Sequence, residues 1–333
     1  MISNTASDLM LQVDGLKMHF PIIKGVIRKQ VGSVFAVDGV SFHINQGETL
    51  GLVGESGCGK TTVGRCLIGL YRPTAGSIVF EGQEVAKHSQ KQLIPLRRRM
   101  QMIFQDPYSS LNPRMRVRNI IGEVLKVHKL VEPKDKNQRI AKLLEQVGLK
   151  PEFAARYPHE FSGGQRQRIG VARALAMEPA MIVADEPVSA LDVSVQAQVI
   201  NLLERLKQDL NLSMLMISHD LSVVEHIADR IAVMYLGKIV ETASDHDLYN
   251  APHHPYTQAL LEAIPQPQSG GRARRQSRKL LGGDVPSPIN PPQGCYFHPR
   301  CPRVENQCKK EYPPMTEVSP GHTVSCFFPG RKR

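Results

Sequence analysis

The first part of the chain alternates apolar and polar residues in the pattern of a β-sheet. Residues 8–50 are predicted to form this region. Within it, Val40, Phe42 and Ile44 alternate with polar neighbours, so that one face of the sheet is buried. A further short strand is predicted over residues 76–82, where an apolar run lies between glycine turns.

The middle of the chain follows a helical period instead. Apolar residues recur at helical spacing in two successive segments, which contain Ile120, Ile121, Val124 and Leu125, and then Ile140, Leu143, Leu144 and Val147. We therefore predict a helical insert over about residues 106–178. It separates two portions of the chain that have strand character.

Beyond the insert, strands and helices alternate. Strands are predicted over residues 181–184, 213–217 and 231–234, with helices around 199–206 and over 221–228. Alternating elements of this kind build a mainly parallel sheet covered by helices. The sequence therefore predicts an α/β fold whose functional site lies at the carboxyl ends of the strands.

Composition indicates a globular protein, with 41% hydrophobic and 22% charged residues. No apolar run approaches the ~18 residues that a membrane span needs, and the first residues lack the pattern of a secretory signal. We therefore expect the chain to remain in the cytosol. Of the net charge of +11, most arises in residues 265–333, with 12 Lys and Arg against 4 Asp and Glu. This proline-rich segment lacks periodicity, which favours a solvated extension over a nucleic-acid partner.

The clearest chemical motif is a phosphate-binding loop. It matches G-x-x-x-x-G-K-[ST] at every fixed position, with Gly54, Glu55, Ser56, Gly57, Cys58, Gly59, Lys60 and Thr61. The apolar run at residues 49–53 supplies the preceding strand, and the predicted helix from Thr62 directs its positive end at the phosphates. We expect Lys60 to contact the terminal phosphates of ATP and Thr61 to offer its hydroxyl to Mg²⁺.

A pair of carboxylates follows a predicted buried strand. Asp185 and Glu186 end the apolar run at residues 181–184, which delivers them to the phosphate edge of the sheet. Asp185 is placed to hold Mg²⁺, and Glu186 to polarise a water molecule for attack on the terminal phosphate. An apolar strand ending in Asp-Glu is common by itself, but its combination with Lys60 is specific.

A second anion site is predicted where a helix begins after the insert. Ser162 is a good N-cap, and Gly163 and Gly164 expose main-chain N–H groups ahead of Gln165. An ordinary capped helix could have the same sequence. This motif therefore indicates an anion site only in combination with the phosphate-binding loop and the carboxylate pair.

The order and spacing of these motifs resemble the ATP-binding cassette (ABC) ATPases over residues 8–250. The resemblance implies an ABC-type P-loop fold in which Ser162 to Gln165 contact nucleotide on a partner subunit. It also implies site roles for four further residues, which are Phe20, Gln105, Asp192 and His219. Gln105 would contact Mg²⁺ and the attacking water, and His219 the terminal phosphate together with Glu186. Phe20 would stack on adenine, with Phe35 as the competing candidate.

The remainder of the chain resembles the C-terminal extension of ATPase subunits from dipeptide and oligopeptide importers. The segments that carry this resemblance are residues 254–261 and 286–295. We expect a nucleotide-binding domain over residues 8–260 and an irregular extension over residues 261–333.

The resemblance implies an ATPase that powers peptide uptake at the cytoplasmic face of the cell membrane, as a peripheral subunit. Its direct partners would be a second ABC ATPase chain, with which it forms a heterodimer, and two membrane permease subunits. An extracytoplasmic peptide-binding protein would be an indirect partner. The part of the insert between Gln105 and Pro158 would form a groove that receives a cytoplasmic helix of a permease subunit. Two alternatives are a soluble ABC ATPase of translation or DNA repair and a non-hydrolysing, ATP-sensing regulatory subunit. The short insert argues against the first, and Glu186, Gln105 and His219 argue against the second.

Four of the 6 cysteines cluster near the end of the chain, at Cys295, Cys301, Cys308 and Cys326. Disulfides are disfavoured in a reducing cytosol, so the alternatives are a metal site and incidental thiols. Four thiolates suit Zn²⁺ or a [4Fe–4S] cluster, and the absence of a C-x2-C pair favours the cluster. The resemblance also implies a cluster, so we expect [4Fe–4S], with zinc and free thiols as the alternatives.

Overall fold

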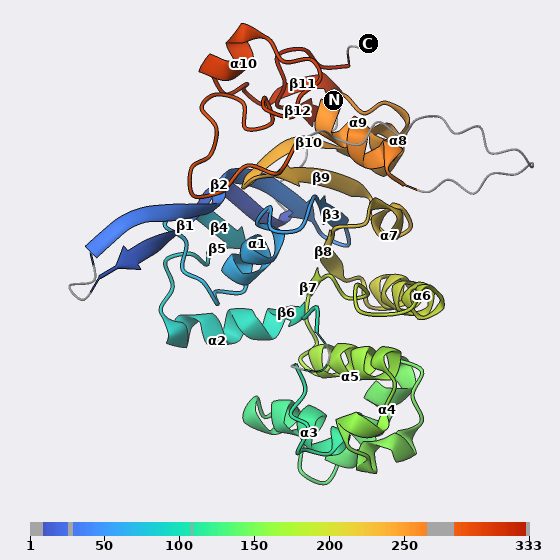
Figure 1. The fold of residues 1–333 in the computed structure, drawn as a ribbon. Helices are drawn as coiled ribbons and strands as arrows, with labels where there is room; N and C mark the ends of the chain where they lie inside the picture. Colours follow the sequence, from blue (N-terminus) through green and yellow to red (C-terminus); the bar gives the residue numbers. More distant parts are fainter. Residues whose placement is uncertain (1–8, 26–28, 107, 109, 265–282, 331–333) are drawn as a thin grey trace, which may run out of the picture.

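The computed structural model describes residues 9–25, 29–106, 108, 110–264 and 283–330. The molecule has helices at one end, sheets in the middle and the C-terminal residues at the other end (Figure 1). The basic residues predicted to form a solvated segment, at 272–279 and 331–333, lie outside the described part of the chain.

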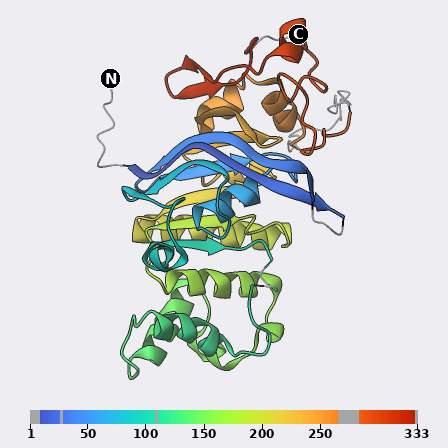
Figure 2. The ribbon, with the colours of Figure 1, turned by 90° about the vertical axis from the view of Figure 1, so that its left-hand side faces the viewer.

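A four-stranded antiparallel sheet forms the first β region. Its strands, in the spatial order β2-β1-β4-β5, are β2 (Lys29–Asn45), β1 (Leu9–Lys24), β4 (Ala75–Phe80) and β5 (Gln83–Glu84). The predicted alternation is confirmed, since Val40, Phe42 and Ile44 are buried and the intervening Ser41 is exposed. Figure 2 shows the long β1–β2 hairpin crossing the molecule between the insert and the C-terminal residues.

An eight-stranded sheet forms the second β layer, in the order β11-β12-β10-β9-β3-β8-β7-β6. The strands from β9 to β6 pair in parallel, as the α/β pattern predicts. Their bounds are β9 (Arg230–Tyr235), β3 (Thr49–Val53), β8 (Ser213–Ser218), β7 (Met181–Asp185) and β6 (Met100–Ile103). Because β3, β7 and β8 are buried along their whole length, their sequences are continuous apolar runs rather than alternating ones.

Helices pack around these sheets and form the insert. Those near the sheets are α1 (Lys60–Leu67), α2 (Gln90–Arg99), α6 (Val193–Leu210), α7 (Leu221–Glu225), α8 (Asp245–Asn250) and α9 (Pro255–Glu262). The insert holds α3 (Val117–Val127), α4 (Lys136–Gln146), the short 3-10 helices η1 (Pro151–Ala155) and η2 (Pro158–Glu160), and α5 (Gly163–Leu175). The predicted apolar positions of α4 are confirmed, since Ile140, Leu143 and Leu144 are buried.

The C-terminal residues are more regular than the sequence indicated. They contain α10 (Asn306–Lys310) and the strands β11 (Thr316–Ser319) and β12 (His322–Val324). β12 pairs with β10 (Lys238–Ser244), so this segment extends the main sheet. A buried contact strengthens the junction, where the His322 ring lies 2.7 Å from the carboxylate of Glu241. No helix in the described ranges combines the length and apolarity of a membrane span.

Candidate functional site

The glycine-rich loop joins β3 to α1 at the edge of the main sheet. Gly54 and Gly59 have φ angles of 154° and 109°, which other residues rarely adopt. A Cβ atom at Gly54 would lie 2.1 Å from the carbonyl oxygen of Met234, and one at Gly59 would lie 2.0 Å from that of Ala36. Both glycines are therefore required by the turn and by the close approach of neighbouring main chain.

Lys60 lies inside this loop. Its buried ammonium donates hydrogen bonds to the carbonyl oxygens of Gly54 (2.7 Å) and Glu55 (3.1 Å). Ser56 and Gly57 are exposed at the crest of the loop. The positive charge of Lys60 thus lies beneath the exposed main chain of the loop, where a phosphate group can bind. Lys60 is also the first residue of α1, whose helix dipole favours anions at this end.

Thr61 and Asp185 lie together although they come from different elements. The Thr61 hydroxyl donates a 2.8 Å hydrogen bond to the Asp185 carboxylate at the end of β7. Burial raises the pKa of Asp185, against smaller opposing effects of Thr61 and nearby cationic groups. A hydroxyl and a carboxylate at this spacing are hard oxygen donors that fit Mg²⁺, which usually takes few protein ligands beside phosphate oxygens.

Glu186 accepts two hydrogen-bonding contacts at the same edge. The Gln105 side-chain amide donates to its Oε2 atom at 2.9 Å, and His219 Nδ1 lies 3.1 Å from the same oxygen. The Glu186 side chain is 11% exposed, whereas that of His219 is 51% exposed. The structure therefore brings Glu186, Gln105 and His219 together, with the carboxylate held between a strand end and the start of the insert.

Ser162 begins helix α5 in a capping box. Its hydroxyl accepts from Gln165 N (3.4 Å), while the Gln165 side chain accepts from Ser162 N (3.1 Å). Among the described residues, no hydrogen bond joins this turn to the loop of residues 54–61, and α5 lies with α3 and α4, apart from α1 (Figure 1). Asp192 is the N-cap of α6. The preceding residue, Leu191, lies beside the Ser162 turn, since a Cβ at Gly163 would lie 3.1 Å from the Leu191 side chain.

The two candidate aromatic residues have different surroundings. Phe20 on β1 packs edge to face against Tyr71, with ring centroids 5.3 Å apart. Phe35 on β2 makes a similar contact with His19 at 4.5 Å. The neighbouring Ala36 contacts the glycine-rich loop through its carbonyl oxygen. The assignment of Phe20 to adenine stays a prediction.

A contact from the C-terminal residues was not anticipated from the sequence. The Arg300 guanidinium donates two hydrogen bonds to Glu55 in the glycine-rich loop, at 2.8 and 3.0 Å. The main-chain N–H of Glu55 donates to the Tyr256 hydroxyl at 2.9 Å. Arg300 is 245 residues from Glu55, and no sequence periodicity or motif connects positions so far apart.

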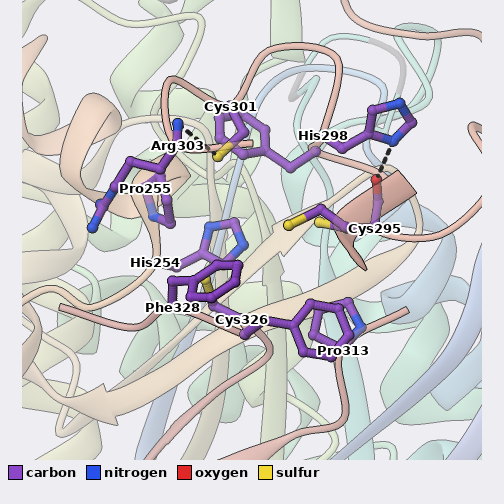
Figure 3. Close-up of a pocket in the computed structure, with 12 residues that line it drawn as sticks. His254, Pro255, Cys295, His298, Cys301, Arg303, Pro313, Cys326 and Phe328 are labelled. Atoms are coloured by element: carbon purple, nitrogen blue, oxygen red, sulfur yellow. Dashed lines mark hydrogen bonds between the residues drawn. The ribbon is translucent and has the colours of Figure 1, made fainter. Parts of the chain in front are cut away.

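The predicted iron–sulfur cluster is wrong. The four C-terminal cysteines line one pocket together with His254 and Phe328 (Figure 3). Within the described residues, however, no group of three or more His, Cys, Asp or Glu side chains is arranged to hold a metal ion. All six cysteines are free thiols. Burial raises the pKa of Cys295 to about 12 and also raises the pKa values of Cys301 and Cys326, so these free thiols are protonated at neutral pH.

Two family models match the chain. The model described as ABC transporter covers residues 37–189. The one described as oligopeptide/dipeptide transporter, C-terminal region, covers residues 240–308. The chain is also similar to the oligopeptide transport ATP-binding protein AppF of Bacillus subtilis, with 54% identity over 322 residues, which is 96% of this chain and 98% of AppF.

Solved structures share the fold at lower sequence identity. One is CbiO1 of Clostridium perfringens, part of the ABC transporter complex CbiONQ, with a TM-score of 0.62, 24% identity, and coverage of 73% of this chain and 91% of CbiO1. Another is a dimeric structure of the ATP-binding cassette MJ0796 bound to ADP and phosphate, with a TM-score of 0.63, 24% identity, and coverage of 71% of this chain and 98% of MJ0796. The predicted α/β cassette fold is confirmed.

Proposed function

Because the chain belongs to the ABC transporter family of ATP-binding proteins, we propose that it hydrolyses ATP to drive peptide import. The observation that carries this proposal is the meeting of Lys60, Thr61, Asp185 and Glu186 at one edge of the sheet, in a chain that matches the peptide-transporter C-terminal region. The name of AppF supports the peptide substrate.

The residues of the site have complementary roles in this proposal. Lys60 and the N–H groups of the loop bind the phosphates of ATP, and Glu186 accepts a proton from the attacking water. Gln105 and His219 hold the Glu186 carboxylate in place, and they reach the same oxygen atom from two sides. Thr61 and Asp185 would hold Mg²⁺, with Gln105 at the edge of its site, and the ion would neutralise charge on the phosphates.

A second subunit would complete the site. Ser162 is exposed, and in the described residues its turn forms no hydrogen bond with the glycine-rich loop of its own chain, which suits a contact with ATP on a partner. We therefore propose a heterodimer with another ABC ATPase, bound to two permease subunits at the cytoplasmic face of the membrane. An extracytoplasmic peptide-binding protein would supply the peptide.

Reconstitution of the complete transporter in vesicles tests this function. ATP hydrolysis should depend on this chain, rise when peptide and its binding protein are present, and be lost in Glu186→Gln while ATP binding remains. Glu225→Gln, at an exposed position on α7, is the matched control and should behave as the parent. Hydrolysis that peptide never stimulates would contradict peptide import. An isolated chain that hydrolyses ATP as fast as the assembled transporter would contradict the need for a partner.

A further inference from the structure

The glycine-rich loop carries a negative charge of its own, at Glu55. A carboxylate within a phosphate-binding loop opposes the binding of a polyanion, because like charges repel across a protein interior more strongly than in water. Arg300 meets this carboxylate with two parallel hydrogen bonds of 2.8 and 3.0 Å. The Arg300 side chain is 6% exposed and that of Glu55 26%, so solvent has little access to the arginine side of the pair.

The ion pair is held from several sides. The Arg300 guanidinium lies over the Tyr235 ring, 5.8 Å from its centroid, and Tyr235 packs against Tyr256 and Phe297. Tyr256 also accepts the hydrogen bond from Glu55 N. The Glu55 side chain is therefore held by the C-terminal extension and its main-chain N–H by α9.

The same C-terminal residues contact the strand that flanks the loop. The carbonyl oxygen of Pro288 accepts from Phe35 N at 2.9 Å, and the Tyr296 hydroxyl donates to Asp38 at 2.9 Å. Phe35 directly precedes Ala36 and Asp38 follows it two residues later, and the carbonyl oxygen of Ala36 lies against Gly59. The segment around residues 288–300 thus fixes both the glycine-rich loop and its neighbour.

We propose that Arg300 is a positioning residue for ATP binding, which neutralises Glu55 and turns it away from the phosphates. The nucleotide site is then not confined to the cassette, because a residue of the C-terminal extension sets the charge and the shape of the loop. This inference rests on the proposal that residues 54–61 hold the phosphates of ATP.

Two substitutions separate the charge of the pair from its packing. Arg300→Met keeps much of the side-chain volume and leaves Glu55 unpaired, so the Kd for ATP should rise about tenfold or more. Adding Glu55→Gln removes the unpaired charge and should restore most of that loss. Arg300→Lys keeps the positive charge and should lose less affinity than Arg300→Met. The matched control is Arg303→Met, because Arg303 is also an arginine of the extension that bonds to the cassette, through Gln258.

The measurement is the Kd for ATP of the full chain, read by calorimetry alongside the thermal unfolding midpoint. Unchanged affinity in Arg300→Met would overturn the proposal. So would a loss that Glu55→Gln fails to restore, since that result indicates packing alone. If Arg300→Met does not fold, equal affinities of Arg300→Lys and the parent support the neutralising role, and a tenfold loss in Arg300→Lys overturns it. Lys60→Ala tests the underlying site separately. If this variant still bound ATP with the affinity of the parent, the phosphates would not be held by residues 54–61.

Discussion

The Thr61 hydroxyl donates a 2.8 Å hydrogen bond to the Asp185 carboxylate, although 124 residues separate the two in sequence. The sheet explains the contact. β3 leads into the loop before Thr61, β7 ends at Asp185, and both strands pair in parallel with β8, which lies between them. Parallel strands end at one edge of a sheet, so side chains that follow different strands meet there.

Asp185→Asn should abolish most activity without destabilising the fold. Burial raises the pKa of Asp185, so the native state holds the ionised carboxylate less readily than the unfolded chain does. A raised acid pKa costs stability once the pH rises above the unfolded value, and the amide removes that cost at pH 7. ATP hydrolysis should fall about 100-fold or more, because the carboxylate for Mg²⁺ is lost.

Thermal unfolding and ATP hydrolysis at several Mg²⁺ concentrations measure the two effects. Asp209→Asn, at an exposed position on α6, should change neither. A marked drop in the unfolding midpoint of Asp185→Asn would contradict the effect of burial. Full activity would remove Asp185 from the proposed ion site.

Gln105→Ala should impair transport more than ATP binding. Gln105 joins the start of the insert to the sheet edge that carries Glu186, since its amide donates to Glu186 (2.9 Å) and lies 3.4 Å from the Ser189 hydroxyl. These are its contacts with the edge, and the phosphate loop does not depend on them. Peptide uptake and hydrolysis in vesicles should therefore fall, while the Kd for ATP stays near that of the parent. An equal loss of binding and transport would indicate a role confined to the nucleotide site.

The parallel core was predictable because its strands are short, apolar and separated by amphipathic helices. The runs at residues 181–184 and 213–217 match β7 and β8 closely. The pairing of β12 with β10 was not predictable. β12 is a three-residue strand, His322–Val324, which is too short to show a hydrophobic period in the sequence. It pairs with the free edge of β10, where the His322 ring lies 2.7 Å from the Glu241 carboxylate.

The site was predictable where a motif specifies local geometry. The glycines and Lys60 lie within one short stretch, residues 54–60, so their arrangement follows from the loop itself. The pair of Arg300 and Glu55 depends on tertiary packing and has no local signal. The cysteines show the opposite case. Their clustering in sequence does bring them to one pocket, but in the part of the chain that the structure describes their side chains are not arranged to hold a metal ion.

Acid should destabilise the protein through His254. This ring caps α9 by accepting from Tyr256 N (3.1 Å), and it is 1% exposed. Burial lowers the pKa of His254 to about 4 from its ordinary 6.5, with Glu241 opposing and Arg303 assisting the shift. Between these pH values the unfolded chain binds a proton that the native state does not, so stability is lost as the pH falls, by about 3 kcal/mol near pH 4.

Denaturant unfolding measured from about pH 7 to pH 4 reports this loss. His254→Asn keeps an acceptor at the helix cap and cannot titrate, so its stability should depend less on pH than that of the parent. His246→Asn, at an exposed position in α8, should leave the parent's pH dependence intact. Identical pH profiles for the parent and His254→Asn would show that the acid sensitivity arises at other residues.

Two glycines on α5 should respond oppositely to the same change. A Cβ at Gly164 would lie 2.3 Å from Cγ1 of Val195 on α6, too close for any real contact. Gly164→Ala should therefore force α5 and α6 apart and lower the free energy of unfolding by about 1–3 kcal/mol. The displaced helix carries the Ser162 turn, so hydrolysis in the assembled transporter should fall as well. At Gly170, nothing lies within 4 Å of the added Cβ.

Gly170→Ala is therefore the matched control within the same helix. Alanine has the higher helix propensity, so this variant should gain about 0.5–1 kcal/mol in the free energy of unfolding and keep its hydrolysis. Denaturant unfolding of both variants gives the comparison directly. Because both variants carry the same substitution in α5, helix propensity alone would raise the stability of both. A stabilised Gly164→Ala would mean that α5 and α6 do not meet at Val195, and the placement of the Ser162 turn beside Asp192 would then also be wrong.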